Sequence, residues 1–131
     1  MDQFDEFADE LLRTAPQVAQ ELRRGEDDVR PDPEFPGSWL STAGRAVVRC
    51  FDRLDESRRV AVLAMVERHL ATGTQPMKDA VATEFLEALA SAVSGHRLDG
   101  PTLARYLGKE SRAYLDAWDQ FTMGRSTLDP T

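Results

Sequence analysis

The clearest pattern of hydrophobic and polar positions lies between Pro76 and Gly95. At about 100° per residue, one side of this stretch collects apolar residues, namely Val81, Ala82, Phe85, Leu86, Ala88, Leu89, Ala92 and Val93. Proline is favoured in the first turn of a helix and glycine at the left-handed residue that ends one, so Pro76 and Gly95 mark the two ends. The apolar arc is too wide for one neighbour to cover. The pattern therefore predicts a helix over 76–95 at the centre of an all-helical domain.

Two helices are predicted at the start of the chain. Asp2 is a suitable N-cap for a helix of about three turns, because apolar residues then recur at spacings of three and four: Phe4, Phe7, Ala8, Leu11 and Leu12. Pro16 interrupts this pattern and is tolerated in a first turn, so a second, short helix is expected from Pro16 to about Arg23.

The segment 24–37 breaks the helical pattern. It contains three prolines and shows no apolar period, which indicates a loop. Loops of this length without internal structure are uncommon in compact domains and tend to be functional or mobile. Five acidic residues lie in this segment: Glu26, Asp27, Asp28, Asp32 and Glu34.

Two longer helices are predicted after this loop. Ser38 is a suitable N-cap for the first, which runs to about Leu54 and collects apolar residues on one side: Trp39, Leu40, Ala43, Val47, Cys50, Phe51 and Leu54. The second runs from Ser57 to about Ala71 and is apolar on most sides. Because short turns join these helices to the helix over 76–95, the three are expected to pack as antiparallel neighbours.

Two patterns complete the chain. Asp99 or Gly100 caps a helix that begins at Pro101 and weakens at Gly108. A final helix covers about Lys109 to Met123. Its expected inner face consists of Ser111, Tyr114, Leu115, Trp118 and Phe121, and its expected outer face of Arg112, Asp116, Asp119 and Gln120.

These elements define the predicted fold class. No strand-like alternation is present, and the tail 124–131 is expected to fray. We therefore predict a single all-α domain over residues 1–131, either a compact bundle of five to seven antiparallel helices or a stack of helical hairpins of the HEAT type.

The net negative charge of the protein is concentrated at one end of the chain. The net charge is −7, and residues 1–36 hold 11 acidic and four basic residues, whereas the remaining 95 residues hold 12 of each. The whole excess therefore belongs to the N-terminal quarter. Such a field repels nucleic acid and anionic membranes and attracts basic protein surfaces. We expect a protein partner, and neither a nucleic acid nor a membrane.

The expected setting is the cytoplasm. The first residues are acidic where a signal peptide carries basic ones, and the longest apolar run, 60–66, is too short to span a bilayer. Cys50 is the only cysteine and cannot form an internal disulfide; its apolar neighbours predict that it is buried.

No residue pattern indicates a metal or cofactor site. The two histidines, His69 and His96, do not belong to a metal-binding spacing, and the acidic segment lacks the glycine and terminal glutamate of a helix-loop-helix calcium site. His69 is expected to be a partly exposed helix residue and His96 a loop residue. Glycine-rich phosphate loops are absent from the sequence.

Catalysis is not indicated either. The sequence has neither a GxSxG turn nor a serine followed three residues later by lysine. Glu84 and Glu87 lie three residues apart on a helix, as a general acid and base sometimes do, but the same pair is typical of the solvated face of an amphipathic helix, which is the interpretation we favour. We predict that the protein is not an enzyme.

The run 103–118 permits one sharper alternative. It has the order of a helix-turn-helix, with Ala104 at the close packing point and Gly108 at the turn. Its second helix would then present Glu110, Ser111, Arg112 and Asp116 to a DNA major groove. Such a surface on an acidic protein is poorly suited to phosphate.

Several stretches resemble, in their order, a family of small all-helical bacterial proteins associated with toxin immunity. They are FDEFADELLRTAPQVAQEL, VERHLATG, VATEFLEALAS and YLGKESRAYLDAWDQF. The resemblance covers most of the chain and implies a non-catalytic protein that neutralises a toxin by binding it. No functional residues transfer from it.

Charge and resemblance together predict a non-catalytic protein-binding domain, acting as a monomer or homodimer, whose partner is a basic toxin domain. The predicted partner-binding residues are Glu26, Asp27, Asp28, Asp32 and Glu34. The alternative is a regulatory or structural helical module that binds through an apolar groove between helices, with Trp39, Trp118 or Tyr114 as anchors. Both tryptophans lie on predicted inner faces, which favours a role in core packing instead.

Overall fold

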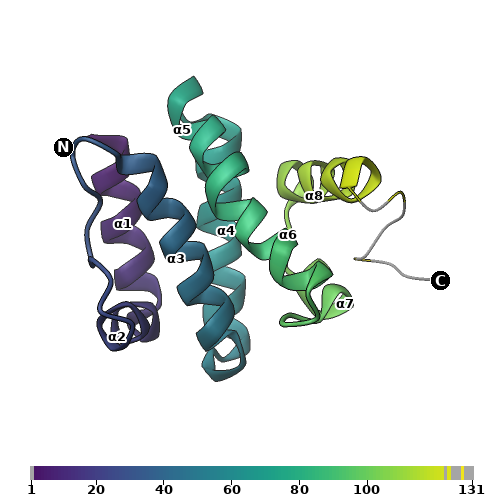
Figure 1. The fold of residues 1–131 in the computed structure, drawn as a ribbon, viewed down its shortest axis with the longest axis horizontal. Coiled ribbons are helices and arrows are strands. Elements are labelled where there is room, and N and C mark those ends of the chain that lie inside the picture. The colour runs from purple at the N-terminus through teal and green to yellow at the C-terminus, as the bar shows by residue number, and fades with distance from the viewer. Residues whose placement is uncertain (1, 123, 125–127, 129–131) are drawn as a thin grey trace.

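A computed structural model describes residues 2–122 together with Gly124 and Leu128, and the regular structure of these residues is entirely helical (Figure 1). The predicted all-α class is confirmed. The helices are α1 (Gln3–Thr14), α2 (Pro16–Arg24), α3 (Pro36–Cys50), α4 (Glu56–Thr72), α5 (Gln75–Ala80), α6 (Glu87–Ser94), α7 (Gly100–Ala104) and α8 (Lys109–Thr122), with a 3₁₀ turn η1 (Phe51–Arg53) and a π-helical segment η2 (Val81–Leu86).

The helix starts follow the capping residues, with one correction. Asp2 caps α1 by accepting a hydrogen bond from the backbone N–H of Asp5 (2.8 Å), as predicted. Ser38 is not an N-cap, because α3 begins two residues earlier at Pro36, whose fixed φ suits a first turn. The Ser38 hydroxyl instead donates to the carbonyl oxygen of Phe35 (2.9 Å). The connection between α2 and α3 is therefore residues 25–35, which we call the acidic loop.

The predicted central helix exists, but it is not a uniform α-helix. The chain continues without a break from α5 through η2 into α6, and the π-helical turn packs against α3, α4 and α8. Gly95 does not end this helix in the left-handed conformation, since its φ is −88°; His96 adopts φ 61° instead. The prediction for Gly95 is therefore wrong by one residue.

A close approach of two backbones fixes α3 against this helix. A Cβ atom on Gly44 would lie 2.9 Å from the Cβ of Ala88 and 3.0 Å from the carbonyl oxygen of Phe85. Such distances are shorter than normal van der Waals contact, so the crossing requires the missing side chain of Gly44. On the inner side of the crossing lies the core, in which Phe7, Leu40, Phe85 and Leu89 are at most 1 % exposed.

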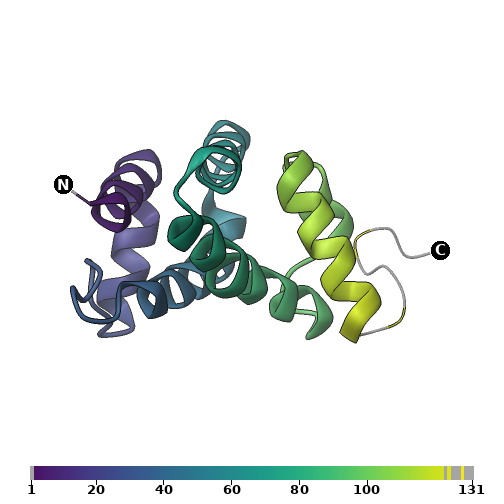
Figure 2. The same ribbon diagram turned by 90° about the horizontal axis from the view of Figure 1, so that it is seen from above.

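The helices follow one another along the length of the molecule. Figures 1 and 2 show α1 and α2 at one end, α3, α4 and the α5–α6 helix in the middle, and α7 and α8 at the other end. In Figure 1, α4 lies behind α3 and the α5–α6 helix and runs opposite to both, so α3 and α6 run in the same direction. No helix within the described residues has both the length and the hydropathy needed to cross a membrane.

The inner face of α8 differs from the prediction. Ser111, Leu115 and Asp119 are buried, whereas Phe121 is 91 % exposed. Phe121 was expected inside and Asp119 outside. The buried row of α8 is 111–115–119, whose members are four residues apart and share one face of the helix. Its first member, Ser111, is held by hydrogen bonds to Glu67 of α4. Of the tail expected to fray, Leu128 is buried, and residues 125–127 and 129–131 lie outside the described part of the chain.

Candidate functional site

The acidic loop is held to the helices by its own backbone and by one arginine. The indole N–H of Trp39 donates to the carbonyl oxygen of Asp28 (2.9 Å). Arg30 pairs with Asp9 and lies 3.6 Å from Asp5, both on α1. The hydrogen bond and charge of Asp9 raise the pKa of the Arg30 guanidinium above its usual range. The loop is thus tied to α1 on one side and to α3 on the other.

All five predicted partner-binding residues are exposed on this loop. Asp32 accepts a hydrogen bond from the backbone N–H of Glu34 (2.9 Å), which shapes the tip. Asp27 lies 3.8 Å from the guanidinium of Arg49 on α3, and Glu26 adopts a left-handed φ of 58° in the turn that leaves α2. The structure thus brings the five together on one exposed loop.

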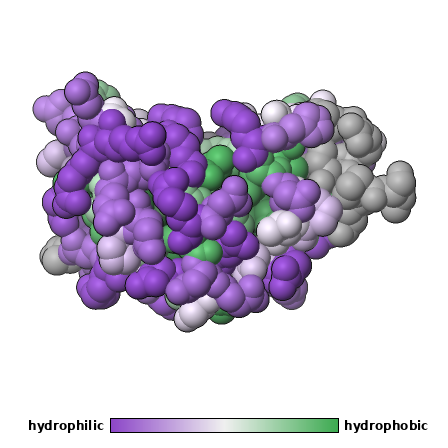
Figure 3. All heavy atoms as spheres, turned by 90° about the horizontal axis from the view of Figure 1, so that it is seen from below, coloured by the Kyte–Doolittle hydropathy of each residue, from purple (hydrophilic) through white to green (hydrophobic). Residues whose placement is uncertain are grey.

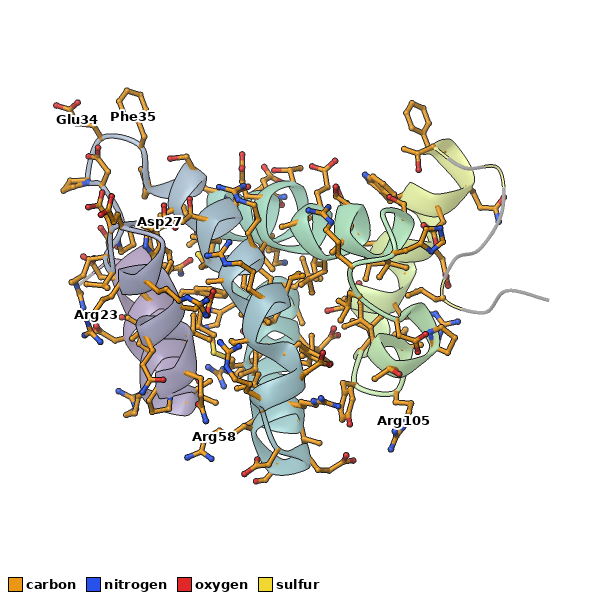
Figure 4. The ribbon with its side chains drawn as sticks, turned by 60° about the horizontal axis from the view of Figure 1, so that its bottom comes forward. Arg23, Asp27, Glu34, Phe35, Arg58 and Arg105 are labelled. Atoms are coloured by element: carbon orange, nitrogen blue, oxygen red, sulfur yellow. The ribbon has the colours of Figure 1, made fainter. Side chains whose placement is uncertain are left out.

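Sequence reasoning missed the most conspicuous residue of this loop. Phe35 is 65 % exposed, and Figure 4 shows its ring and the Glu34 side chain projecting from the tip, away from the helices. The available signal was a phenylalanine flanked by acidic and proline residues in a segment without an apolar period. An exposed aromatic ring surrounded by charges is typical of an interface anchor, since aromatic residues are enriched at protein interfaces.

A buried carboxylate supports the loop from below. Glu21 of α2 is 6 % exposed and accepts hydrogen bonds from Arg49 (3.0 Å) and Arg53 (2.6 Å). Burial acts to raise the pKa of Glu21, but the hydrogen bonds from the two arginines outweigh it and leave that pKa below its usual value. The hydrogen bonds of Glu21 with Arg49 and Arg53 fix the end of α2, where the acidic loop begins, against the end of α3 and η1.

A second feature is a groove between α3 and the η2–α6 helix, with a volume of about 620 Å³. Its apolar lining comes from Val48, Ala88 and Ala92, and its polar lining from Ser41, Arg45, Arg49, Asp52, Thr83, Glu84, Glu87, Ser91 and Arg97. Figure 3 shows the molecule from below, where polar side chains cover most of the surface and apolar side chains appear between them.

Glu84 and Glu87 both line this groove, so the pair is not simply part of an open solvated face. The indole N–H of Trp118 on α8 donates to Oε1 of Glu87 (3.1 Å), which fixes that carboxylate. Burial, followed by the charge of Glu87, raises the pKa of the nearby Tyr114 hydroxyl. The sequence predicted a groove between helices only as an alternative and did not place it, because the groove forms between helices far apart in the chain.

Neither histidine is placed beside these groups. His69 is 13 % exposed in its side chain, with its Nε2 3.0 Å from Oε1 of Glu10 and its ring edge-on to Phe7. Burial opposes ionisation of Glu10, yet hydrogen bonds from Arg68 and His69 lower its pKa. His96 follows α6 in the turn, as expected for a loop residue. Within the part of the chain that the structure describes, no three His, Cys, Asp or Glu side chains are grouped to hold a metal ion.

The run 103–118 does not present the surface expected of a DNA reader. Ser111, one of the four residues predicted to face a major groove, is fully buried and donates its hydroxyl to Glu67 (2.8 Å). Arg112 lies 3.2 Å from Asp116 on its own helix. Gly108 is required for a different reason, because a Cβ there would lie 2.4 Å from the side chain of Glu67.

Comparison with known proteins identifies the family. The class is that of small all-helical domains, and residues 8–123 match the model of one such family, described as a domain of unknown function, DUF7674. The chain belongs to this family. No curated protein and no solved structure matched the chain.

Proposed function

We propose that this protein is a non-catalytic protein-binding domain that recognises a basic protein surface through the acidic loop, with Phe35 as its apolar anchor. The observation that carries this proposal is the exposure of the Phe35 ring beside Glu34 at the tip of a loop whose backbone is held by Trp39 and Arg30. Buried aromatic residues surrounded by a polar rim supply most of the binding energy in protein interfaces.

The fixed backbone supports the proposal because binding then costs little ordering. A loop that is already tied to α1 and α3 loses less conformational freedom on binding than a free one, so more of the contact energy remains as affinity. The five exposed carboxylates add long-range attraction. Electrostatic attraction of this kind mainly raises the association rate and weakens as salt is added.

The partner we propose is a basic toxin domain, which is the partner implied by the resemblance to toxin-immunity proteins. In this proposal the domain acts in the cytoplasm, as a monomer or homodimer, and neutralises the toxin by covering its surface. The scaffold that we propose for this role is a compact bundle of antiparallel helices.

The test begins with affinity capture from the native cell followed by mass spectrometry. The bait is the unchanged chain, and the variants are Phe35→Ala and the simultaneous replacement of Glu26, Asp27, Asp28, Asp32 and Glu34 by serine. Phe121→Ala is the matched control, because Phe121 is also an exposed phenylalanine but lies on α8. We expect one basic protein that both loop variants lose and the control retains.

Kinetics on the captured partner then separate the two contributions. The serine variant should slow association and flatten its salt dependence, whereas Phe35→Ala should speed dissociation and leave the salt dependence intact. A partner bound equally well by the unchanged chain and by both loop variants would place the interface elsewhere. A secreted toxin among the captured proteins supports the immunity role, while an endogenous regulator as the main partner contradicts it.

A further inference from the structure

The two helices that form the walls of the groove, α3 and the η2–α6 helix, run in the same direction. Because α3 and α6 are parallel and cross at Gly44 and Ala88, positions along one wall correspond to positions along the other (Figure 1). Arg45 thus lies near the level of Glu84 and Glu87, and Asp52, about two turns later, lies near the level of Arg97.

At each end of the groove, the two walls carry charges of opposite sign. The wall that is basic at one end is acidic at the other. At one end α3 carries Arg45 and the facing wall carries Glu84 and Glu87. At the other end η1, which follows α3 directly, carries Asp52 and the facing side carries Arg97. Among the described residues, none of the ion pairs within 4.0 Å joins the two walls. The acidic and basic side chains on opposite walls of the groove therefore do not pair with one another.

The two arginines at these levels are held by neutral partners. Arg45 donates to the hydroxyls of Ser41 (2.8 Å) and Thr42 (3.2 Å), and Arg97 donates to the hydroxyl of Ser91 (3.4 Å). A guanidinium bound only to hydroxyl groups retains its attraction for a carboxylate, and such charge-assisted bonds are stronger than neutral ones. Arg49 is different, since Glu21 and Asp27 already pair with it.

The length of the groove fits a short helix. The lining positions on this wall run from Ser41 on α3 to Asp52 in η1, which at 1.5 Å per residue is a length of roughly 17 Å, or about three helical turns. The lining residues Ala88 and Ala92 are small, which allows another backbone to approach closely. The wall also contains the π-helical turn, a feature found frequently at functional sites.

We propose that this groove binds an amphipathic helix of the protein partner, with a small apolar face against Val48, Ala88 and Ala92 and with charged side chains of both signs on each flank. The flank that faces the α3 side carries an acidic side chain opposite Arg45 and a basic one opposite Asp52. The flank that faces the η2–α6 side carries a basic side chain opposite Glu84 and an acidic one opposite Arg97. This inference rests on the proposed role in protein binding, but it assigns the helix to a surface distinct from the acidic loop.

The probe is a displayed library of 15-residue helical peptides that vary at their apolar and charged positions. The library is selected on the unchanged chain, and the enriched peptides are measured by isothermal titration. Ser91 is exposed and lines the groove, so Ser91→Trp places a large side chain in it. Ser57→Trp is the matched control, because Ser57 is an exposed residue of α4 outside the groove. We expect at least a tenfold loss of affinity with Ser91→Trp and none with Ser57→Trp.

A second test exchanges charges between the protein and the peptide, so its result does not depend on how a tryptophan packs in the groove. Arg45→Glu should weaken the enriched peptides about tenfold, and replacing the facing glutamate of the peptide by lysine should restore the affinity. Circular dichroism and thermal unfolding establish that each variant folds. Enriched peptides that are insensitive to both Ser91→Trp and Arg45→Glu would overturn the proposal, as would a library from which no peptide is enriched.

Two further outcomes separate this inference from the proposed function. Peptides that lose affinity with Phe35→Ala but not with Ser91→Trp bind the acidic loop, so the groove proposal fails while the loop proposal stands. Sensitivity to Ser91→Trp alone supports the groove irrespective of the loop. A self-association of the chain in sedimentation that Ser91→Trp abolishes makes a second copy the occupant and contradicts a partner helix.

Discussion

Ser111 donates two hydrogen bonds to the same carboxylate oxygen of Glu67, one from its backbone N–H (2.9 Å) and one from its hydroxyl (2.8 Å). The other oxygen of Glu67 accepts from the backbone N–H of Glu110 (2.9 Å). The first turn of α8 is therefore capped by a residue of α4 rather than by its own chain neighbours. Burial acts to raise the pKa of Glu67, but the hydrogen bonds of Glu110 and Ser111 lower it.

Replacing this cap should loosen the C-terminal end of the domain. Glu67→Ala leaves the N–H groups of Glu110 and Ser111 without their acceptor, and we expect the free energy of unfolding to fall by about 1–3 kcal/mol. Glu34→Ala, which removes an exposed glutamate, should change it by less than about 0.5 kcal/mol. Urea denaturation measures both; equal stability of the two variants would show that the cap contributes nothing.

The crossing of α3 and α6 predicts a contrast between two glycines of the same helix. Gly44→Ala introduces a Cβ at 2.9 Å from the Cβ of Ala88 and should destabilise the domain by about 1–3 kcal/mol. Gly37→Ala meets only the Cβ of Ala80 at 4.0 Å, so it should be neutral or stabilising by up to about 1 kcal/mol. Thermal unfolding distinguishes them, and a Gly44→Ala variant as stable as Gly37→Ala would contradict this crossing geometry.

Acid should destabilise the protein partly through Glu21. Because the folded state lowers the pKa of Glu21, the stabilisation is present above the unfolded pKa of about 4.5 and is lost as the pH falls through the folded value. Glu21→Gln should therefore be less stable than the unchanged chain at pH 7. Below pH 4.5 the difference between the two should shrink, which denaturation at a series of pH values measures. A constant difference at all pH values would exclude ionisation of Glu21 as the cause.

Cys50 should be unreactive in the folded protein. Its side chain is fully buried, and burial raises the pKa of its thiol to about 11, so little thiolate exists at pH 8. We expect an aromatic disulfide reagent to modify Cys50 at the rate at which the domain opens, and at once in denaturant. Modification of the native chain within the mixing time would show that this part of α3 is accessible.

Much of the fold could be predicted because it depends on neighbours in the chain. Asp2 and Pro16 set the starts of α1 and α2, and the apolar spacing of Trp39, Val47 and Cys50 identified the buried face of α3. These effects act within one or two helical turns, so the sequence pattern contains them. The acidic loop was found in the same way, from its prolines and its missing period.

The candidate site was only partly predictable. The five acidic residues of the loop were identified from charge alone, and the structure exposes them. Phe35 was missed, since an apolar residue in a loop carries no sign of whether it is buried or exposed. The position of the groove was not predicted either. Its walls, 41–52 and 83–97, are separated in the chain by α4 and meet only when the helices pack.

By itself, the sequence determined the helical class, most helix ends and the acidic N-terminal quarter, because capping, helical periodicity and charge are local properties of the chain. Tertiary structure alone decided which face of α8 is buried: Ser111 binds Glu67 of α4, Asp119 is buried and Phe121 is exposed. It also decided the parallel crossing at Gly44 and hence the groove. These features depend on side chains more than 40 residues apart that meet only when the helices pack, and no local pattern encodes such a distance.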